Sequence, residues 1–330
     1  MTTTLLAVVQ LLQGTVLSSE TQLPIGFSVV NLAPTGGKQF TDGAGRFTFA
    51  NVQAGTYVLS IRQIGYTPLD TQLVLTGHDT TAVRVALRRL AIELPPVTVI
   101  ARQCTNPGRP DSSDRALLAV FDQLQENARR FELLADSYPF RYVLELSQRT
   151  VSLRGDTGRL EVQRLQFSSD DNHPYAVGRV VEPGWGPWAG PGVLVIHSAD
   201  LQDLGNSTFI TNHCFWLAGR DTIAGDSLIR IDFDPGPRIS SADMRGAAYL
   251  DPVTYELRYT TTSLTRPERS ALTDVSAMTF RTRFRNIAPG VPLQDSLAVV
   301  TTYRYGRRAK IDTQRTVDVR FRRGALRAPR

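Results

Sequence analysis

Four histidines are the first residues to consider, because histidine ligates zinc and transfers protons near neutral pH. They are His78, His173, His197 and His213. A zinc peptidase needs a His-x-x-Glu pair and a third ligand, since catalytic zinc takes three protein ligands and keeps one position open. None of the four has a glutamate three residues further on. The sequence therefore predicts no metal site, and it contains no phosphate-loop or dinucleotide motif that would predict a cofactor.

A hydrolytic nucleophile is equally hard to place. The pattern Gly-x-Ser-x-Gly is absent. Cys214 directly follows His213, but neighbours on a strand point to opposite faces, so this histidine is badly placed to activate that thiol. We assign no catalytic residue and expect a protein that is not an enzyme. The alternative is a hydrolase whose site assembles in the second half of the chain near His197 and His213.

The only two cysteines are Cys104 and Cys214. In an exported protein, two cysteines that can meet form a disulfide, and this one would attach a linker to a strand of the following domain. The alternative is two separate thiols, with Cys214 an ordinary buried strand residue. A Cα–Cα distance within about 7 Å would decide for the bond.

The segment 182–192, EPGWGPWAGPG, carries Trp185 and Trp188 in a loop rich in glycine and proline. Exposed tryptophans can stack on sugars or lie at a lipid interface, so these two form a candidate ligand platform. The alternative is a loop that folds back to cover one end of a sheet.

The elements that would position these residues begin with a hairpin at residues 41–66. Phe47 and Phe49 alternate with Thr48, and glycine pairs mark the flanking turns. With Gly14-Thr15-Val16, Gly26 before Ser28-Val29-Val30, Ala54-Gly55-Thr56-Tyr57 and Gly65-Tyr66, this region resembles the carboxypeptidase regulatory-like domain of bacterial proteins. The resemblance implies a transthyretin-like β-sandwich over residues 12–101, without catalytic residues and typical of exported proteins.

Period-two alternation predicts seven strands in this sandwich. Their expected ranges are 13–17, 27–32, 45–50, 56–63, 71–76, 81–88 and 96–101. Residues 1–11 precede them, and their apolar run TLLAVVQLL is either a truncated signal or an extra strand.

Residues 102–111 read as a linker, and a long helix follows in the second domain, residues 112–330. Asp111, Ser112 and Ser113 are candidate N-caps, and apolar residues recur at helical spacing from Leu117 to Ala135. Arg115, Gln125, Arg129 and Arg130 fall outside the apolar stripe, so we expect them on the exposed side.

The remainder reads as antiparallel strands, which predicts a curved sheet packed on that helix. The expected ranges are 142–151, 159–167, 175–182, 193–197, 208–217, 227–233, 246–250, 255–263, 275–286, 297–305 and 316–322. The piece MRGAAYLDPVTYELRYTTTSL resembles hairpins of the LolA/LolB-like half-barrels. The predicted fold class is therefore mainly β: a sandwich followed by an α+β domain.

The composition of the chain limits the kinds of partner that we expect. The 330 residues suit two domains, and no run of 18 or more apolar residues predicts a membrane-spanning helix. The net charge of +6 is concentrated in residues 266–330, where arginines alternate with apolar residues as on a sheet with one wet face. We therefore expect no nucleic acid. We expect a non-catalytic protein of the periplasm, outer membrane or exterior that binds an envelope protein, a glycan or a lipid.

Overall fold

The computed structural model describes residues 9–35, 37–77, 80–92, 103–152, 158–171, 173–184, 194–305 and 308–322. The chain divides into two compact units at the junction of Ala91 and Ile92. Among the described residues no helix is long and apolar enough to cross a membrane.

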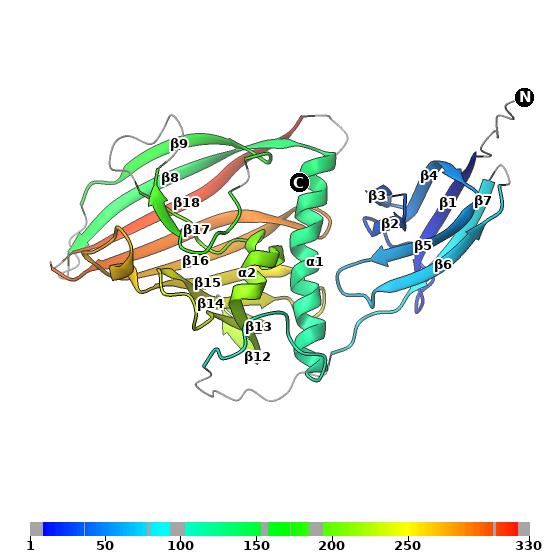
Figure 1. Cartoon of the computed structure of the whole chain (residues 1–330). Coiled ribbons are helices and arrows are strands. Elements are labelled where there is room, and N and C mark those ends of the chain that lie inside the picture. Colours follow the sequence, from blue (N-terminus) through cyan, green and yellow to red (C-terminus); the bar gives the residue numbers. More distant parts are fainter. Residues whose placement is uncertain are drawn as a thin grey trace, which may run out of the picture. The chain divides into compact units, whose positions relative to one another are not determined.

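The first unit contains two small sheets, ordered β4-β1-β7 and β3-β2-β5-β6 (Figure 1). Their strands are β1 (Val9–Ser18), β2 (Val29–Ala33), β3 (Gly37–Phe40), β4 (Arg46–Gln53), β5 (Gly55–Arg62), β6 (Leu69–Leu75) and β7 (Thr80–Leu87). Alternate residues of these strands form one apolar core, in which Leu12, Val30 and Leu59 are fully buried.

The predicted strands of this unit are confirmed within the described residues, with two differences. Strand β1 starts at Val9, three residues before the expected domain boundary, and residues 1–8 lie outside the described ranges. Strand β3 was not predicted, because Gly37-Lys38-Gln39 shows no apolar alternation. The strand expected at 96–101 lies outside the described residues.

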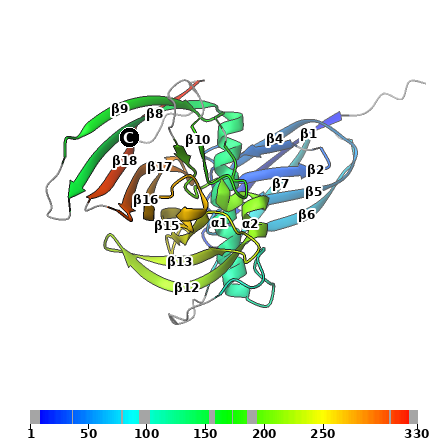
Figure 2. The ribbon, with the colours of Figure 1, turned by 60° about the vertical axis from the view of Figure 1, so that its left-hand side comes forward.

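The second unit is one nine-stranded antiparallel sheet, ordered β12-β13-β14-β15-β16-β17-β18-β8-β9. The sheet curves into an open arch with α1 and α2 on its concave side (Figures 1 and 2). A separate hairpin pairs β10 with β11. The elements are α1 (Arg115–Ser137), β8 (Phe140–Ser152), β9 (Glu161–Ser168), β10 (Val181–Pro183), β11 (Leu194–Ile196), η1 (Asp203–Gly205), α2 (Ser207–Asn212), β12 (His213–Ile223), β13 (Asp226–Pro235), β14 (Asp243–Leu250), β15 (Leu257–Thr265), η2 (Pro267–Arg269), β16 (Val275–Ala288), β17 (Val291–Tyr303) and β18 (Arg308–Phe321).

Two predicted strands of this unit were wrong in part. Residues 208–212 belong to the short helix α2, because the Asn206 side chain caps it by accepting from the backbone N–H of Thr208 and Phe209 at 2.7 and 3.3 Å. Their β-branched residues suggested a strand, but the cap decides the conformation. In the range 175–182 only Val181 and Glu182 are in a strand, because a turn at Gly178, with φ of +78°, prevents a continuous strand over this range.

Helix α1 packs its apolar stripe against the concave face. The Phe121 and Phe215 rings lie 4.8 Å apart between centroids, and Phe131 meets Phe140 at 6.1 Å. The helix begins after Asp114, whose carboxylate accepts from the N–H of Leu117 at 3.0 Å, so the N-cap lies later than the three predicted candidates.

The expectation that Gln125 and Arg130 are exposed was wrong, since only 6% and 0% of their surfaces are accessible. Arg130 donates to the carbonyl oxygens of Gly290 and Pro289 at 2.8 and 3.0 Å, which lie in the turn between β16 and β17. Gln125 accepts from Arg109 at 3.2 Å. Helical periodicity predicts which face of the helix is apolar. It does not predict which polar side chains form hydrogen bonds with distant parts of the chain and are buried for that reason.

Candidate cavity of the second unit

A cavity of about 890 Å³ lies between the sheet and the hairpin β10–β11. Strands β16 and β17 supply an apolar floor, and β18, β8 and β9 supply a largely polar wall. The floor includes Val275, Met278, Phe280, Leu297 and Val299. The wall includes Gln148, Glu161, Gln163, Lys310, Asp312 and Gln314. Leu194, Val195 and Ile196 of β11 line it from the hairpin.

Strand register explains why the lining changes character across the sheet. Val299 pairs with Asp312, and Asp312 pairs with Gln148, so one cross-strand row runs from apolar to polar. The neighbouring row alternates, from Leu297 through Gln314 and Leu146 to Gln163. An elongated ligand that lies along the first row would therefore meet hydrocarbon at one end and hydrogen-bonding groups at the other.

His197 lies at the wall of this cavity and is held by Asp203. The imidazole Nε2 is 2.7 Å from Asp203 Oδ2, and the same carboxylate oxygen accepts from the backbone N–H of Asp200 at 2.9 Å. Asp200 in turn accepts from the N–H groups of Gln202 and Asp203 at 2.8 and 3.1 Å. The three side chains thus fold the segment after β11 into a compact turn.

The charged groups of this turn shift one another's pKa values. Burial opposes the charge of His197, but the hydrogen bond and charge of Asp203, with the charges of Asp200 and Glu182, raise its pKa to about 9. Burial and the charge of Asp203 raise the pKa of Asp200 to about 7. The charge of His197 and the hydrogen bonds from two backbone N–H groups act in the opposite direction and lower it. At neutral pH, His197 is therefore a cation that donates to Asp203, which makes it unsuitable as a general base.

A smaller recess of about 240 Å³ adjoins the cavity and shares His173, His197 and Asp200 with it. The rings of Tyr142 and Phe167 stack in its wall with centroids 5.8 Å apart. Burial, and then the charges of Asp200 and Asp171, raise the pKa of Tyr142 to about 12, so its hydroxyl stays protonated. The recess adds an aromatic end to the cavity.

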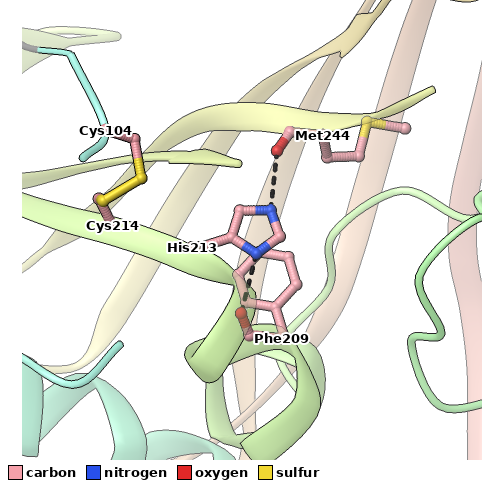
Figure 3. The surroundings of a disulfide bond; sticks show 5 residues. All are labelled: Cys104, Phe209, His213, Cys214 and Met244. Atoms are coloured by element: carbon pink, nitrogen blue, oxygen red, sulfur yellow. Dashed lines mark hydrogen bonds between the residues drawn. A yellow bond between two sulfur atoms is a disulfide. The ribbon is translucent and has the colours of Figure 1, made fainter. Parts of the chain in front are cut away.

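His213 occupies a different place. It is fully buried on the concave side of β12, with Nδ1 2.8 Å from the carbonyl oxygen of Phe209 and Nε2 3.1 Å from that of Met244 (Figure 3). Its ring stacks on Phe209 with centroids 3.8 Å apart. It lines neither cavity, so the structure does not bring His197 and His213 into the shared site that the hydrolase alternative requires.

The predicted disulfide between Cys104 and Cys214 is present, with Cα atoms 5.5 Å apart (Figure 3). Cys214 points to the face of β12 opposite His213, as expected of neighbours on a strand. Both cysteines belong to the second unit, where the bond attaches the segment before α1 to β12. The backbone N–H of Gly108 donates to the carbonyl oxygen of His213 at 2.9 Å and reinforces that attachment.

Trp185 and Trp188 lie outside the described residues, and so does His78. The tryptophans fall in the connection between β10 and β11, the hairpin whose strands line the cavity. Within the ranges that the structure describes, no group of three or more His, Cys, Asp or Glu residues could hold a metal ion.

Asp200 and Asp203 were not singled out from the sequence. With His197 they follow a three-residue spacing, and this was the available signal. The remaining lining comes from strands up to about 170 residues apart in the chain, for which no local pattern exists.

Comparison with known proteins confirms the resemblance of the first unit. Residues 12–99 match the CarboxypepD_reg-like domain family. No curated protein matches the chain.

Several solved structures match parts of this chain at low identity. A LolA superfamily protein from Nitrosomonas europaea is 11% identical, with a TM-score of 0.32 over 61% of this chain and 93% of that chain. A DUF1329 family protein from Desulfovibrio piger is 12% identical, with a TM-score of 0.34 over 64% and 95%. The 5-hydroxyisourate hydrolase of Klebsiella pneumoniae is 22% identical, with a TM-score of 0.21 over 24% and 85%.

Proposed function

We propose that this is a non-catalytic binding protein of the bacterial cell envelope, and that its second unit holds an amphiphilic ligand, of the lipid class, in the concave cavity. The observation that carries the proposal is the division of the cavity into an apolar floor on β16 and β17 and a polar wall on β18, β8 and β9. The volume of about 890 Å³ lies within the range of about 300–1,000 Å³ that is usual for ligand sites.

The polar wall argues for a ligand with a hydrogen-bonding head group. Gln148, Gln163 and Gln314 offer amides that both donate and accept. Lys310 is paired with Asp312 at 3.1 Å, so its charge is already balanced. A neutral or zwitterionic head group suits this wall better than a strongly charged one, because each charge there has a nearby opposite charge or amide.

The cluster around His197 supports a structural role and not a catalytic one. Its imidazole is cationic at neutral pH and is held by Asp203, so it does not take a proton from a nucleophile under those conditions. The disulfide supports a location in the cell envelope, since such bonds persist in oxidising compartments. The loop with Trp185 and Trp188, carried by the cavity hairpin, is the proposed entry platform for the ligand.

The proposal is tested by blocking the cavity. Leu146→Arg places a long charged side chain at the half-buried wall on β8. Val143→Arg is the matched control, since it puts the same side chain on the same strand but on the opposite face. Binding is measured by titration with a fluorescent fatty acid and by mass spectrometry of lipids that copurify with the protein from bacterial envelopes.

We expect the wild type and Val143→Arg to bind the probe equally, and Leu146→Arg to bind it at least tenfold more weakly. The midpoints of thermal unfolding of the two variants should agree. Failure of the wild type to bind any lipid, or equal losses in the two variants, would reject the cavity as the site.

A further inference from the structure

The face of the sheet opposite α1 carries a second hollow, of about 840 Å³. Phe215 points to α1, and Trp216, the next residue of β12, lines the hollow on the other face. Arg230 and Asp232 of β13, Arg245 of β14 and Arg281 of β16 also line it. The backbone of the sheet separates this hollow from the concave cavity.

The hollow arises from one cross-strand row in which small side chains stand between long ones. Trp216 pairs with Asp232, which pairs with Ala247. The row continues from Ala247 to Thr261 and from Thr261 to Arg281. Trp216 and Arg281 thus form the two ends, and Ala247 and Thr261 leave the middle low.

Gly246 helps to form the floor. A Cβ atom at this position would lie 2.1 Å from the carbonyl oxygen of Thr261 on the paired strand. Only glycine allows β14 to approach β15 this closely. Because Gly246 precedes Ala247 on the strand, a side chain there would point to the concave face, and Gly246 bounds the outer hollow through its backbone alone.

The charged groups at the rim are held in place by one another. Arg230 donates to Asp232 at 2.6 Å and to Asp221 at 2.9 Å, and Arg245 lies 3.3 Å from Asp234. The guanidinium of Arg281 lies 5.8 Å from the ring centroid of Tyr259. Donors and acceptors alternate along the rim, and charges of both signs are present.

This set of groups fits a polyhydroxylated ligand. Sugar hydroxyls donate and accept at once, so neighbouring carboxylates and guanidiniums can both bind them, whereas a polyanion would meet the aspartates and a polycation the arginines. The half-buried indole of Trp216 offers an apolar surface for the C–H face of a sugar ring. An elongated hollow that crosses several strands has room for more than one ring. We propose that this outer hollow binds an oligosaccharide.

The test uses the full chain and an array of bacterial and plant oligosaccharides, followed by calorimetric titration of the strongest binders. Thr279→Arg fills the hollow from an exposed position on β16. Ser276→Arg is the matched control, since it adds the same side chain to the same strand at an exposed position that does not line the hollow. Trp216→Ala removes the stacking surface, and Trp216→Phe retains an aromatic ring.

We expect oligosaccharide binding that Thr279→Arg abolishes, that Trp216→Ala weakens at least tenfold, and that Trp216→Phe and Ser276→Arg change less than threefold. Leu146→Arg, in the concave cavity, should leave sugar binding unchanged, so this proposal and the proposed lipid function can fail separately. Binding of no sugar on the array, binding that survives Thr279→Arg, or binding of peptides in place of sugars would overturn the assignment.

Discussion

Removing the disulfide gives the sharpest test of how the second unit is stabilised. The variant is Cys104→Ala/Cys214→Ala, and its counterpart is the wild type in the presence of a reductant. The bond joins residues 110 positions apart. In the chain-entropy model a loop of that length restricts the unfolded chain by about 5 kcal/mol, which is an upper figure because native strain subtracts from it.

For a unit of this size, each kcal/mol of unfolding free energy corresponds to roughly 2–4 °C in the midpoint of thermal unfolding. A loss of about 3–5 kcal/mol should therefore lower the midpoint of the second unit by roughly 6–20 °C. The native fold should survive, since Gly108 still donates to His213 and Arg109 still pairs with Asp122 at 2.6 Å.

Differential scanning calorimetry makes the measurement, and the molecule contains its own control. Both cysteines lie after the junction at Ala91, so the transition of the first unit should not move. Reduction and double substitution should shift the second transition alike. A shift below about 2 °C, or two free thiols titrated in denatured, unreduced wild type, would refute the reasoning.

Three further predictions concern particular residues of the second unit. The folded-state pKa of His197, about 9, is raised above the unfolded value of about 6.5, so its stabilising contribution is fully present below about pH 6.5 and is lost as pH rises through about 9. NMR titration of His197 should show this pKa, and Asp203→Asn should lower it because the hydrogen-bonded carboxylate is then gone. Arg130→Met removes the two hydrogen bonds that the buried guanidinium donates to the carbonyls of Pro289 and Gly290, so we expect the free energy of unfolding, measured by denaturant titration, to fall by about 2–4 kcal/mol. Arg129→Met, on the exposed side, should change it by less than about 0.5 kcal/mol. Trp185→Ala/Trp188→Ala should abolish lipid retention at an unchanged unfolding midpoint if these residues form the entry platform, and a large loss of stability without a binding defect would instead indicate a covering loop.

The sequence predicted the architecture where local chemistry decides it. In the first unit, glycine turns and alternation in stretches such as residues 45–50 specify strands without help from the rest of the chain. The apolar stripe of α1 was equally clear. The disulfide was predictable because two cysteines allow one pairing.

The sequence did not predict features that depend on distant partners. Arg130 looks like any exposed helical arginine until the turn of Gly290, 160 residues later, supplies its acceptors. The concave cavity combines Leu146 with Val299, and only the strand order β17-β18-β8 brings them near one another. Asn206 reversed the expected strand of residues 208–212 through a cap that outweighs β propensity.

The same sheet gives the two proposed sites different mechanical support. Most of the concave cavity rests on β16, β17, β18 and β8, each paired on both sides within the sheet, and only its outer wall reaches β9, the other edge strand. The outer hollow depends on Trp216 of β12, an edge strand that, within the described part of the chain, pairs with β13 alone. The contact of Phe215 with α1, the hydrogen bond from Gly108 to His213 and the disulfide at Cys214 hold this edge from its other sides. The disulfide therefore bears on the outer hollow more than on the cavity, since its loss loosens the edge that carries Trp216 and leaves the inner strands paired as before.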